Sequence, residues 1–143
     1  MQTFMSRPLW GNFLKLFWPP LLIFIVHVFI SHVLDVYTLL PWIDIPMHYL
    51  GGFSMAYSLL LALTFLQEYK FINQLDSVIA FVLVFTLVAT IAVFWEFAEF
   101  SMDQLLKTNV QISLQNTMQD LFMGVLGAAT IIGVKVTRLQ RQP

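Results

Sequence analysis

The sequence predicts an all-α integral membrane protein, a bundle of four transmembrane helices with both termini in the cytoplasm. Three observations lead to this fold class. Of the 143 residues, 59% are hydrophobic and only 10% are charged, whereas an average soluble domain is ~25% charged. Four stretches approach the ~20 mostly apolar residues that a transmembrane helix needs. No stretch shows the alternation with a period of two that is typical of a transmembrane β-barrel.

The composition also limits the classes of function. Seven Lys/Arg and eight Asp/Glu give a formal net charge of −1. Because the chain has no basic patch, we do not expect it to bind nucleic acid. The absence of cysteine excludes disulfides, thiolate zinc sites and cysteine nucleophiles. These facts point to a membrane protein without indicating an activity.

The first element, residues 1–18, is expected to lie in the membrane interface. It mixes aromatic and basic side chains, which favour that position: Trp10, Phe17, Trp18, Arg7 and Lys15. A single transmembrane domain is expected over residues 19–136. Residues 137–143 are expected to form a cytoplasmic tail.

Four spans are expected within the transmembrane domain, at about residues 19–36, 44–66, 78–100 and 117–136. A helix rises about 1.5 Å per residue, so stretches of this length can cross the hydrocarbon core. Glycines and polar side chains interrupt the second and the fourth span. An even number of spans places both termini on the same side.

The basic residues predict which side that is. Six of them lie on the side of the termini: Arg7, Lys15, Lys70, Lys135, Arg138 and Arg141. Only Lys107 falls on the opposite side. Because short loops rich in Lys and Arg stay in the cytoplasm, the sequence predicts cytoplasmic termini and a location in a bacterial cytoplasmic membrane.

The acidic residues are distributed the other way. Glu68 and Asp76 fall in the loop predicted to be cytoplasmic. The other six fall toward the outer ends of the spans: Asp35, Asp44, Glu96, Glu99, Asp103 and Asp120. Like charges held together in a membrane cannot all ionise. We therefore expect that some of these carboxyl groups keep their protons or that a cation neutralises them.

Helical spacing predicts that many of these acids meet at one place. In the third span, Glu96, Glu99 and Asp103 fall within a ~60° arc of the helix. The corresponding polar stripes of the second and fourth spans consist of Asp44, His48, Asn116, Thr117 and Asp120. Counted from the span midpoints, His48, Glu96 and Asp120 lie at one level, ~10–12 Å above the membrane midplane. Three residue types on three helices at one level predict a single site.

The residue types predict a divalent metal ion, namely zinc, manganese or iron, because these ions prefer imidazole and carboxylate ligands. The expected ligands are Asp44, His48, Glu96, Glu99 and Asp120. Glu96 or Glu99 is also the expected catalytic general base. The supporting positions are Asp35, Asp103, Gln115 and Thr117.

Simpler roles remain open for the same residues. Asp44 and His48 have the i, i+4 spacing of a hydrogen-bonded pair that fixes a helix start. Asp120 has the position of an acid that satisfies the amides of a helix N-terminus. Glu96, Glu99 and Asp103 are also compatible with a helix end that faces water.

Three stretches of the chain, IDIPMHYLGGF, FWEFAEF and SLQNTMQDLFMGVLGA, resemble the YjdF-like membrane proteins, a family of unknown function. The first carries the pattern Asp-x-x-x-His-x-x-x-Gly-Phe, and the second carries an aromatic-Glu-Phe-x-Glu-aromatic pattern. The third carries Thr-x-x-Asp before a Gly-Ala pair. The matching residues are Asp44, His48, Gly52, Phe53, Glu96, Glu99, Thr117, Asp120, Gly127 and Ala128. The resemblance covers about residues 40–135.

The resemblance implies a shared polar site but brings no established activity. The layout is also similar, more distantly, to VanZ-like proteins. Three functions stay open: a metal-dependent enzyme acting on a lipid-linked or envelope substrate, a protein that transports protons or cations, and an accessory subunit in which the polar residues are structural. Membrane lipid and a homo- or hetero-oligomeric contact are the expected partners.

Overall fold

The structure is a computed structural model, and it describes residues 9–34, 36–108 and 110–139. Every regular element within these residues is helical. The elements are α1 (Leu9–Val28), the π-helical turn η2 (Phe29–Val33), α2 (Val36–Leu39), the 3₁₀ turn η3 (Pro41–Ile43), α3 (Asp44–Glu68), α4 (Ser77–Leu106) and α5 (Leu114–Leu139). The predicted all-α fold class is therefore confirmed.

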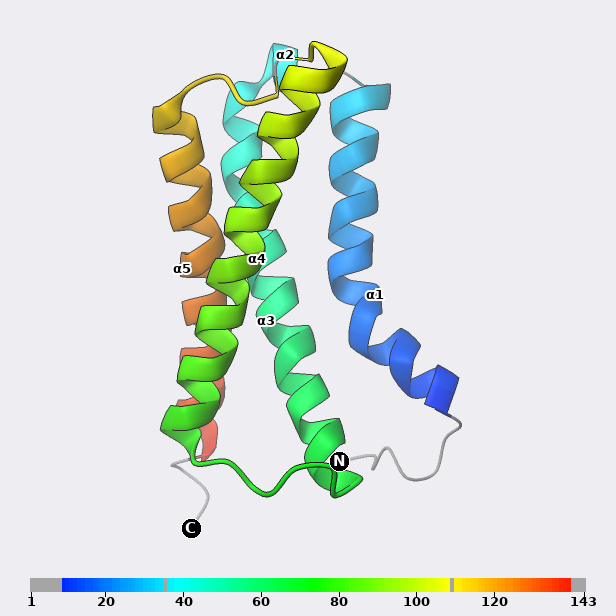
Figure 1. Cartoon of the computed structure of the whole chain (residues 1–143), viewed down its shortest axis with the longest axis vertical. Helices are drawn as coiled ribbons and strands as arrows, with labels where there is room; N and C mark the ends of the chain where they lie inside the picture. Colours follow the sequence, from blue (N-terminus) through cyan, green and yellow to red (C-terminus); the bar gives the residue numbers. More distant parts are fainter. Residues whose placement is uncertain (1–8, 35, 109, 140–143) are drawn as a thin grey trace.

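The four long helices alternate in direction, so that α1 starts and α5 ends at the same end of the molecule (Figure 1). Within the described residues, four segments are long and apolar enough to cross a membrane: Leu14–Ser31, Pro41–Glu68, Ser77–Leu106 and Leu114–Val134. They match the four predicted spans. Which end faces the cytoplasm stays a prediction.

The first helix differs from the prediction at its start. α1 begins at Leu9 and continues through Pro19 and Pro20, so the expected boundary between an interfacial segment and a span lies inside one helix. Proline removes a backbone donor and bends a helix that continues through it. Figure 1 shows the first turns of α1 at an angle to the rest. Residues 1–8 and 140–143 lie outside the described residues.

Where α4 ends and α5 begins, both helices extend beyond the predicted spans. α4 runs on to Leu106, which keeps Asp103 within the helix. α5 begins at Leu114, where the Ser113 hydroxyl accepts a hydrogen bond from the backbone amide of Asn116 at 3.1 Å. This is the geometry of a serine N-cap. Asp120 therefore lies beyond the first turn of α5 and does not cap it.

The hydrophobic core is formed by three of the four long helices. α3, α4 and α5 supply its buried residues: Ala56, Leu60, Val84, Val88, Ala128 and Ile132. The helix α3 packs most closely against α5, and also contacts α1 and α4. Figure 1 shows α1 and α5 on opposite sides of α3. α1 is thus attached to the bundle through α3 and stands outside this core.

Small residues allow α3 and α5 to approach each other closely. A Cβ atom on Gly52 would collide with the backbone of Gly124. A Cβ atom on Gly127 would collide with the backbone of Tyr49. This tight contact fixes α5 against α3 immediately beside the polar residues described next.

Candidate functional site

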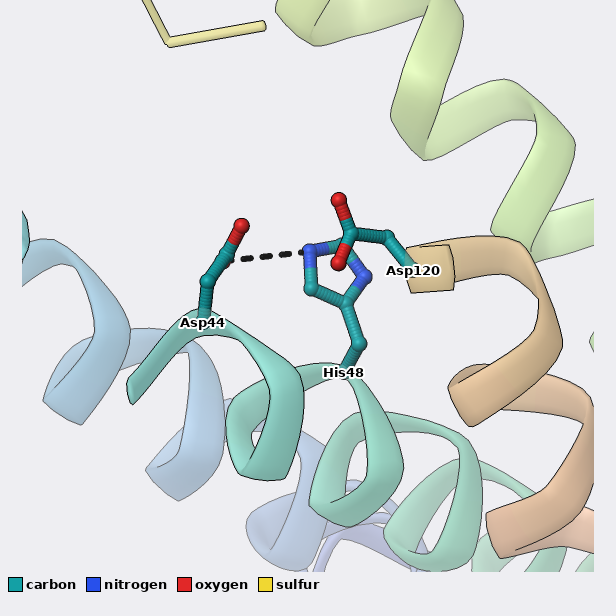
Figure 2. A group of neighbouring side chains, drawn as sticks. All are labelled: Asp44, His48 and Asp120. Carbon is teal, nitrogen blue, oxygen red and sulfur yellow. Dashed lines mark ion pairs between the residues drawn. The ribbon is translucent and has the colours of Figure 1, made fainter. Parts of the chain in front are cut away.

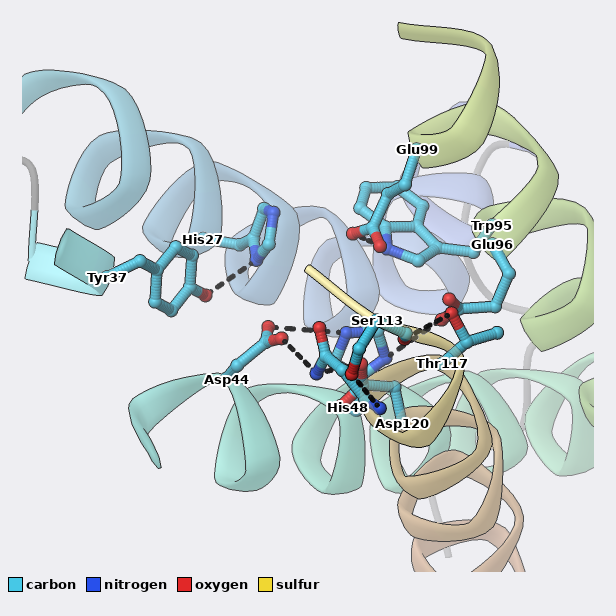
Figure 3. A network of polar contacts seen from close by, with 11 residues as sticks. His27, Tyr37, Asp44, His48, Trp95, Glu96, Glu99, Ser113, Thr117 and Asp120 are labelled. Atoms are coloured by element: carbon cyan, nitrogen blue, oxygen red, sulfur yellow. Dashed lines mark hydrogen bonds and ion pairs between the residues drawn. The ribbon is translucent and has the colours of Figure 1, made fainter. Parts of the chain in front are cut away.

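The polar residues meet at the end of the bundle where α3 and α5 begin and α4 ends (Figure 3). The polar cluster, as we define it, consists of Asp44, His48, Glu96, Glu99 and Asp120. Three of its carboxylates are almost fully buried, with 4% of Glu96, 3% of Glu99 and 1% of Asp120 exposed. The helices thus bring together all the residues that the sequence predicted as metal ligands.

His48 occupies the centre of the polar cluster. Its Nε2 atom lies 3.3 Å from Oδ1 of Asp44, one turn earlier in α3. Its Nδ1 atom lies 3.8 Å from Oε1 of Glu96 on α4. Asp120 reaches the same imidazole from α5 (Figure 2). The ring therefore lies between carboxylates that come from three helices.

Asn116 connects two of these carboxylates. Its Nδ2 atom donates a hydrogen bond of 2.6 Å to Oδ2 of Asp120 and one of 3.4 Å to Oδ2 of Asp44. The amide therefore links the start of α3 to the start of α5. Sequence reasoning placed Asn116 on the polar stripe but gave it no role, because helical phase does not show which helices are neighbours.

The first helix reaches the polar cluster through aromatic residues. Trp95 donates a hydrogen bond of 2.7 Å from Nε1 to Oε1 of Glu99. The ring of Trp95 also meets His27 of α1 edge to face, with centroids 5.5 Å apart. Nδ1 of His27 lies 2.9 Å from the hydroxyl of Tyr37. These contacts continue the polar network from α4 to α1 (Figure 3).

Tyr37 lies between the first two spans, and its hydroxyl stays protonated. Burial raises the pKa of Tyr37 above its ordinary value, and the nearby carboxylate of Asp44 acts in the same direction. A neutral phenol can donate to an unprotonated Nδ1 of His27. Tyr37 and His27 were not among the predicted site residues. Tyr37 lies in the connection between the first two spans, which gives no periodic signal, and His27 was expected deeper in the first span, near the membrane midplane.

Several buried atoms of the polar cluster lack a hydrogen-bond partner within the described part of the chain: Nε2 of His48, Oε2 of Glu96 and Oδ1 of Asp120. The 3.3 Å approach of His48 to Asp44 is an ion-pair contact and not a hydrogen bond. Buried polar atoms are normally paired, because an unpaired one loses its hydration without compensation. These atoms point to a bound group or to protons that complete the site.

Two sets of side chains are arranged to hold a metal ion. Asp44, His48 and Asp120 form one set, and His48, Glu96 and Glu99 form the other. Within each set, one ligand atom per residue lies within 4.8 Å of the others. A histidine that binds a metal through one nitrogen usually donates its other N–H to a carboxylate. His48 fits this rule whichever of its nitrogens binds the metal, since each nitrogen faces a carboxylate.

Comparison with known protein families identifies the chain at the family level. Residues 13–141 match a family described as "Predicted membrane protein (DUF2238)". The chain belongs to this family. It is the YjdF family, which confirms the nearer of the two resemblances seen in the motifs. Nothing in the comparisons supports the resemblance to VanZ-like proteins.

Membership of DUF2238 describes a membrane protein without a known function. No curated protein and no solved structure is significantly similar to this chain. The membrane location that the composition predicted is thus supported by the family and by four candidate spans. The chemistry of the site has to be argued from its own residues.

The supporting residues predicted for this member of DUF2238 are found in different places. Thr117 lies beside Glu96 (Figure 3), whereas Gln115 is exposed. Asp103 is occupied by the loop that leads to α5: it accepts hydrogen bonds from the Thr108 hydroxyl at 2.6 Å and from the amides of Val110 and Gln111 at 2.8 and 2.9 Å. Asp35 lies outside the described residues.

Proposed function

We propose that this protein is a membrane enzyme in which the polar cluster binds a divalent metal ion and acts on a lipid-linked substrate. The observation that carries the proposal is the pair of buried carboxylate oxygens without a hydrogen-bond partner among the described residues, Oε2 of Glu96 and Oδ1 of Asp120. They flank His48, the one imidazole of the cluster. A metal ion coordinated there would give these atoms a ligand.

The charge balance supports a cation. Four carboxylates, those of Asp44, Glu96, Glu99 and Asp120, surround one imidazole, and no ion pair with Lys or Arg is found for them within the described residues. Even a protonated His48 would leave an excess of negative charge if all four were ionised. A divalent cation offsets that excess, and zinc, manganese and iron accept this mixture of ligands.

The residues also suggest how a reaction would be assisted. A bound divalent ion polarises an ester, acyl or phosphate oxygen, or activates water. A carboxylate that does not bind the metal is then available as a general base. Glu99 suits this role because Trp95 fixes its Oε1 atom at 2.7 Å. Glu96 takes the role if the metal lies on the Asp44–Asp120 side of His48.

The distribution of charged residues supports a site at the outer leaflet. With the termini in the cytoplasm, the polar cluster lies at the outer end of α3, α4 and α5. We propose a bacterial cytoplasmic membrane as the location, on the basis of the basic residues at the opposite end. Reporter fusions after Lys70 and after Lys107 test this: cytoplasmic activity is expected for the first and not for the second.

The alternative is a protein without catalysis, either a proton or cation transporter or an accessory subunit with a structural polar network. The bridge from Asn116 to Asp44 and Asp120 favours a network. A transport path is less well supported, because the core of Ala56, Val84 and Ala128 fills the bundle with apolar side chains. Metal content separates the two proposals.

The deciding experiment measures bound metal in the protein purified in detergent after growth with zinc, manganese or iron. We expect stoichiometric metal in the wild type and its loss in H48A and in at least one of E96Q and D120N. Acidification should release the metal, because the ligands must be deprotonated to bind it. The control is E68Q, which removes a carboxylate at the far end of α3 and should keep the metal.

Size-exclusion profiles and helix content establish that each variant is folded. A wild type without stoichiometric metal under any supply would refute the metal enzyme. Metal that persists in both E96Q and D120N would refute the assignment of the ligands. Proton uptake by reconstituted vesicles, lost in H48A, would instead favour transport.

A further inference from the structure

A cavity of about 510 Å³ lies between α1 and the adjoining faces of α3 and α4. This volume falls within the ~300–1,000 Å³ of small-molecule sites in proteins. Apolar side chains form most of its wall, including Leu21, Phe24, Met47, Met55, Val88 and Ile91. The cavity is therefore suited to a hydrocarbon ligand.

The cavity is long in the direction of the helices. Its wall includes His48 and Met55 on α3, and Trp95 and Val88 on α4. A separation of seven residues in a helix corresponds to ~10 Å along its axis. The cavity thus extends from the polar cluster toward the middle of the membrane, in the direction in which lipid chains run.

Polar side chains gather at one end of the cavity. His48 lines the cavity and is also the central residue of the polar cluster. His27 and Trp95 line it as well, and both belong to the network around Glu99 (Figure 3). Among the described residues of the wall, the other polar side chain is that of Ser54, whose hydroxyl donates to the carbonyl of Gly51 at 3.0 Å. The lining therefore matches an amphipathic molecule whose polar group lies at His48.

Gly51 contributes to the space in the cavity. It lines the wall, and a Cβ atom added to it would find no neighbour within 4 Å. Helix packing therefore does not require a glycine at this position. A larger residue would project into the cavity, so Gly51 offers a direct way to fill it.

The cavity opens toward the lipid. Several residues of its wall are also exposed on the outer surface of the bundle, with exposed fractions of 53% for Leu21, 46% for Phe24 and 38% for Ile91. All three lie within candidate membrane spans. A ligand that enters between α1 and α4 thus comes from the hydrocarbon region of the bilayer.

We propose that this cavity binds one hydrocarbon chain of a membrane lipid, which enters from the side and presents its polar group to His48. What happens to that polar group rests on the proposed function. The binding of the hydrocarbon chain does not. Four carboxylates at the cluster favour an uncharged or cationic polar group. An anionic group binds only if a metal ion offsets them.

Photolabelling of the full chain in phosphatidylcholine vesicles tests the proposal. The probe is a long-chain fatty alcohol with a diazirine at mid-chain, and a fatty acid with the same diazirine forms the second arm. Peptides that contain Met55 and Ile91 should carry most of the alcohol label, at sites on the cavity wall. The fatty acid should label them only in metal-loaded protein.

Filling the cavity should remove this labelling. We expect a graded loss in G51A, G51V and G51L, complete in the last. The control is G133L on α5, since a Cβ atom there also meets nothing within 4 Å and Gly133 does not line the cavity. If G51L fails to fold, the graded loss in G51A and G51V still decides the question.

The outcomes distinguish the two proposals. If G51L loses the labelling while its metal content equals that of the wild type, the lipid cavity is supported. This holds whether or not the wild type binds metal. Labelling that persists in a wild type without stoichiometric metal under any supply refutes the metal enzyme but not the cavity. Label spread evenly over lipid-facing segments such as that around Val93, or unaffected by the Gly51 series, would overturn the cavity proposal.

Discussion

Two adjacent glycines in α3 face different surroundings. A Cβ atom on Gly52 would collide with the backbone of Gly124 in α5, whereas one on Gly51 would meet nothing within 4 Å. Successive residues in a helix point about 100° apart, so one glycine faces α5 and the other faces the cavity beside α1. The same residue type thus permits close packing at one position and leaves open space at the next.

The comparison extends to the two sides of the bundle. On the α5 side, Gly52, Gly124 and Gly127 bring the helices together, and Asn116 ties their first turns to each other. On the α1 side, a cavity separates the helices and aromatic contacts of His27 and Trp95 join them. We infer that the α5 side provides stability and that the α1 side adapts to a ligand.

The largest expected effect comes from replacing with leucine the glycine of α3 that faces α5. G52L should prevent stable association of α3 with α5, because backbone atoms cannot move aside as a flexible side chain can. Overpacking typically destabilises by about 1–3 kcal/mol, and a collision with backbone should exceed that range. Thermal unfolding in detergent, read by helix content and by aggregation, should show little or no folded G52L protein.

The matched variant is G51L, which changes the same residue type one position earlier. It should melt at or slightly above the wild-type temperature, because leucine favours a helix over glycine by about 1 kcal/mol. Equal loss of stability in both variants would show that the α1 side is packed as tightly as the α5 side. The comparison between the two sides would then fail.

The second prediction concerns the tie between α3 and α5. N116L removes the donor to Asp120 and Asp44 and leaves the buried carboxylate of Asp120 with less compensation. A hydrogen bond to a charged group contributes about 1.5–3 kcal/mol, so we expect a loss of unfolding free energy in that range. Chemical denaturation in mixed micelles measures it, and N73L, at an exposed position in the loop between α3 and α4, is the control. An unchanged midpoint would show that Asn116 does not stabilise the helix pair.

The third prediction concerns the contact between α4 and α1. W95F keeps an aromatic ring beside His27 but removes the 2.7 Å hydrogen bond to Glu99. We expect a smaller destabilisation of about 1–2 kcal/mol, because α1 stands outside the core and can adjust. Lipid photolabelling should become less specific, since Trp95 lines the cavity. A loss larger than that of N116L would contradict the inferred difference between the two sides.

The helices and the polar cluster were largely predictable from the sequence, because both depend on periodic features. The apolar stretches determined four spans, and helical phase with depth predicted that His48, Glu96 and Asp120 meet. These three residues do share one site in the structure. The prediction worked because carboxylates in a membrane segment avoid lipid and turn inward.

The remaining features depend on which helices are neighbours, and periodicity does not contain that information. Asp103 shares the arc of Glu96 and Glu99, but the loop between α4 and α5 folds back and donates hydrogen bonds to its carboxylate. The cavity could not be predicted either, because it depends on the distance between α1 and α4. Gly51 and Gly52 are adjacent and of the same residue type, and periodicity alone does not show that only Gly52 is required by packing.

The smallest expected effects lie just beyond the ends of α3 and α4, away from the contacts of α3 with α1 and α5. Lys70 and Lys107 adopt left-handed backbone conformations, with φ of 60° and 58°, which glycine adopts at little cost. K70G and K107G should each raise the stability by up to about 1 kcal/mol, measured as a small rise in melting temperature. Because the two loops lie at opposite ends of the bundle, equal gains would show that this effect is independent of the polar cluster. A gain restricted to K70G would instead show that Lys107 stabilises the acidic end through its charge. A K107Q variant should then lose about as much unfolding free energy as K70G gains.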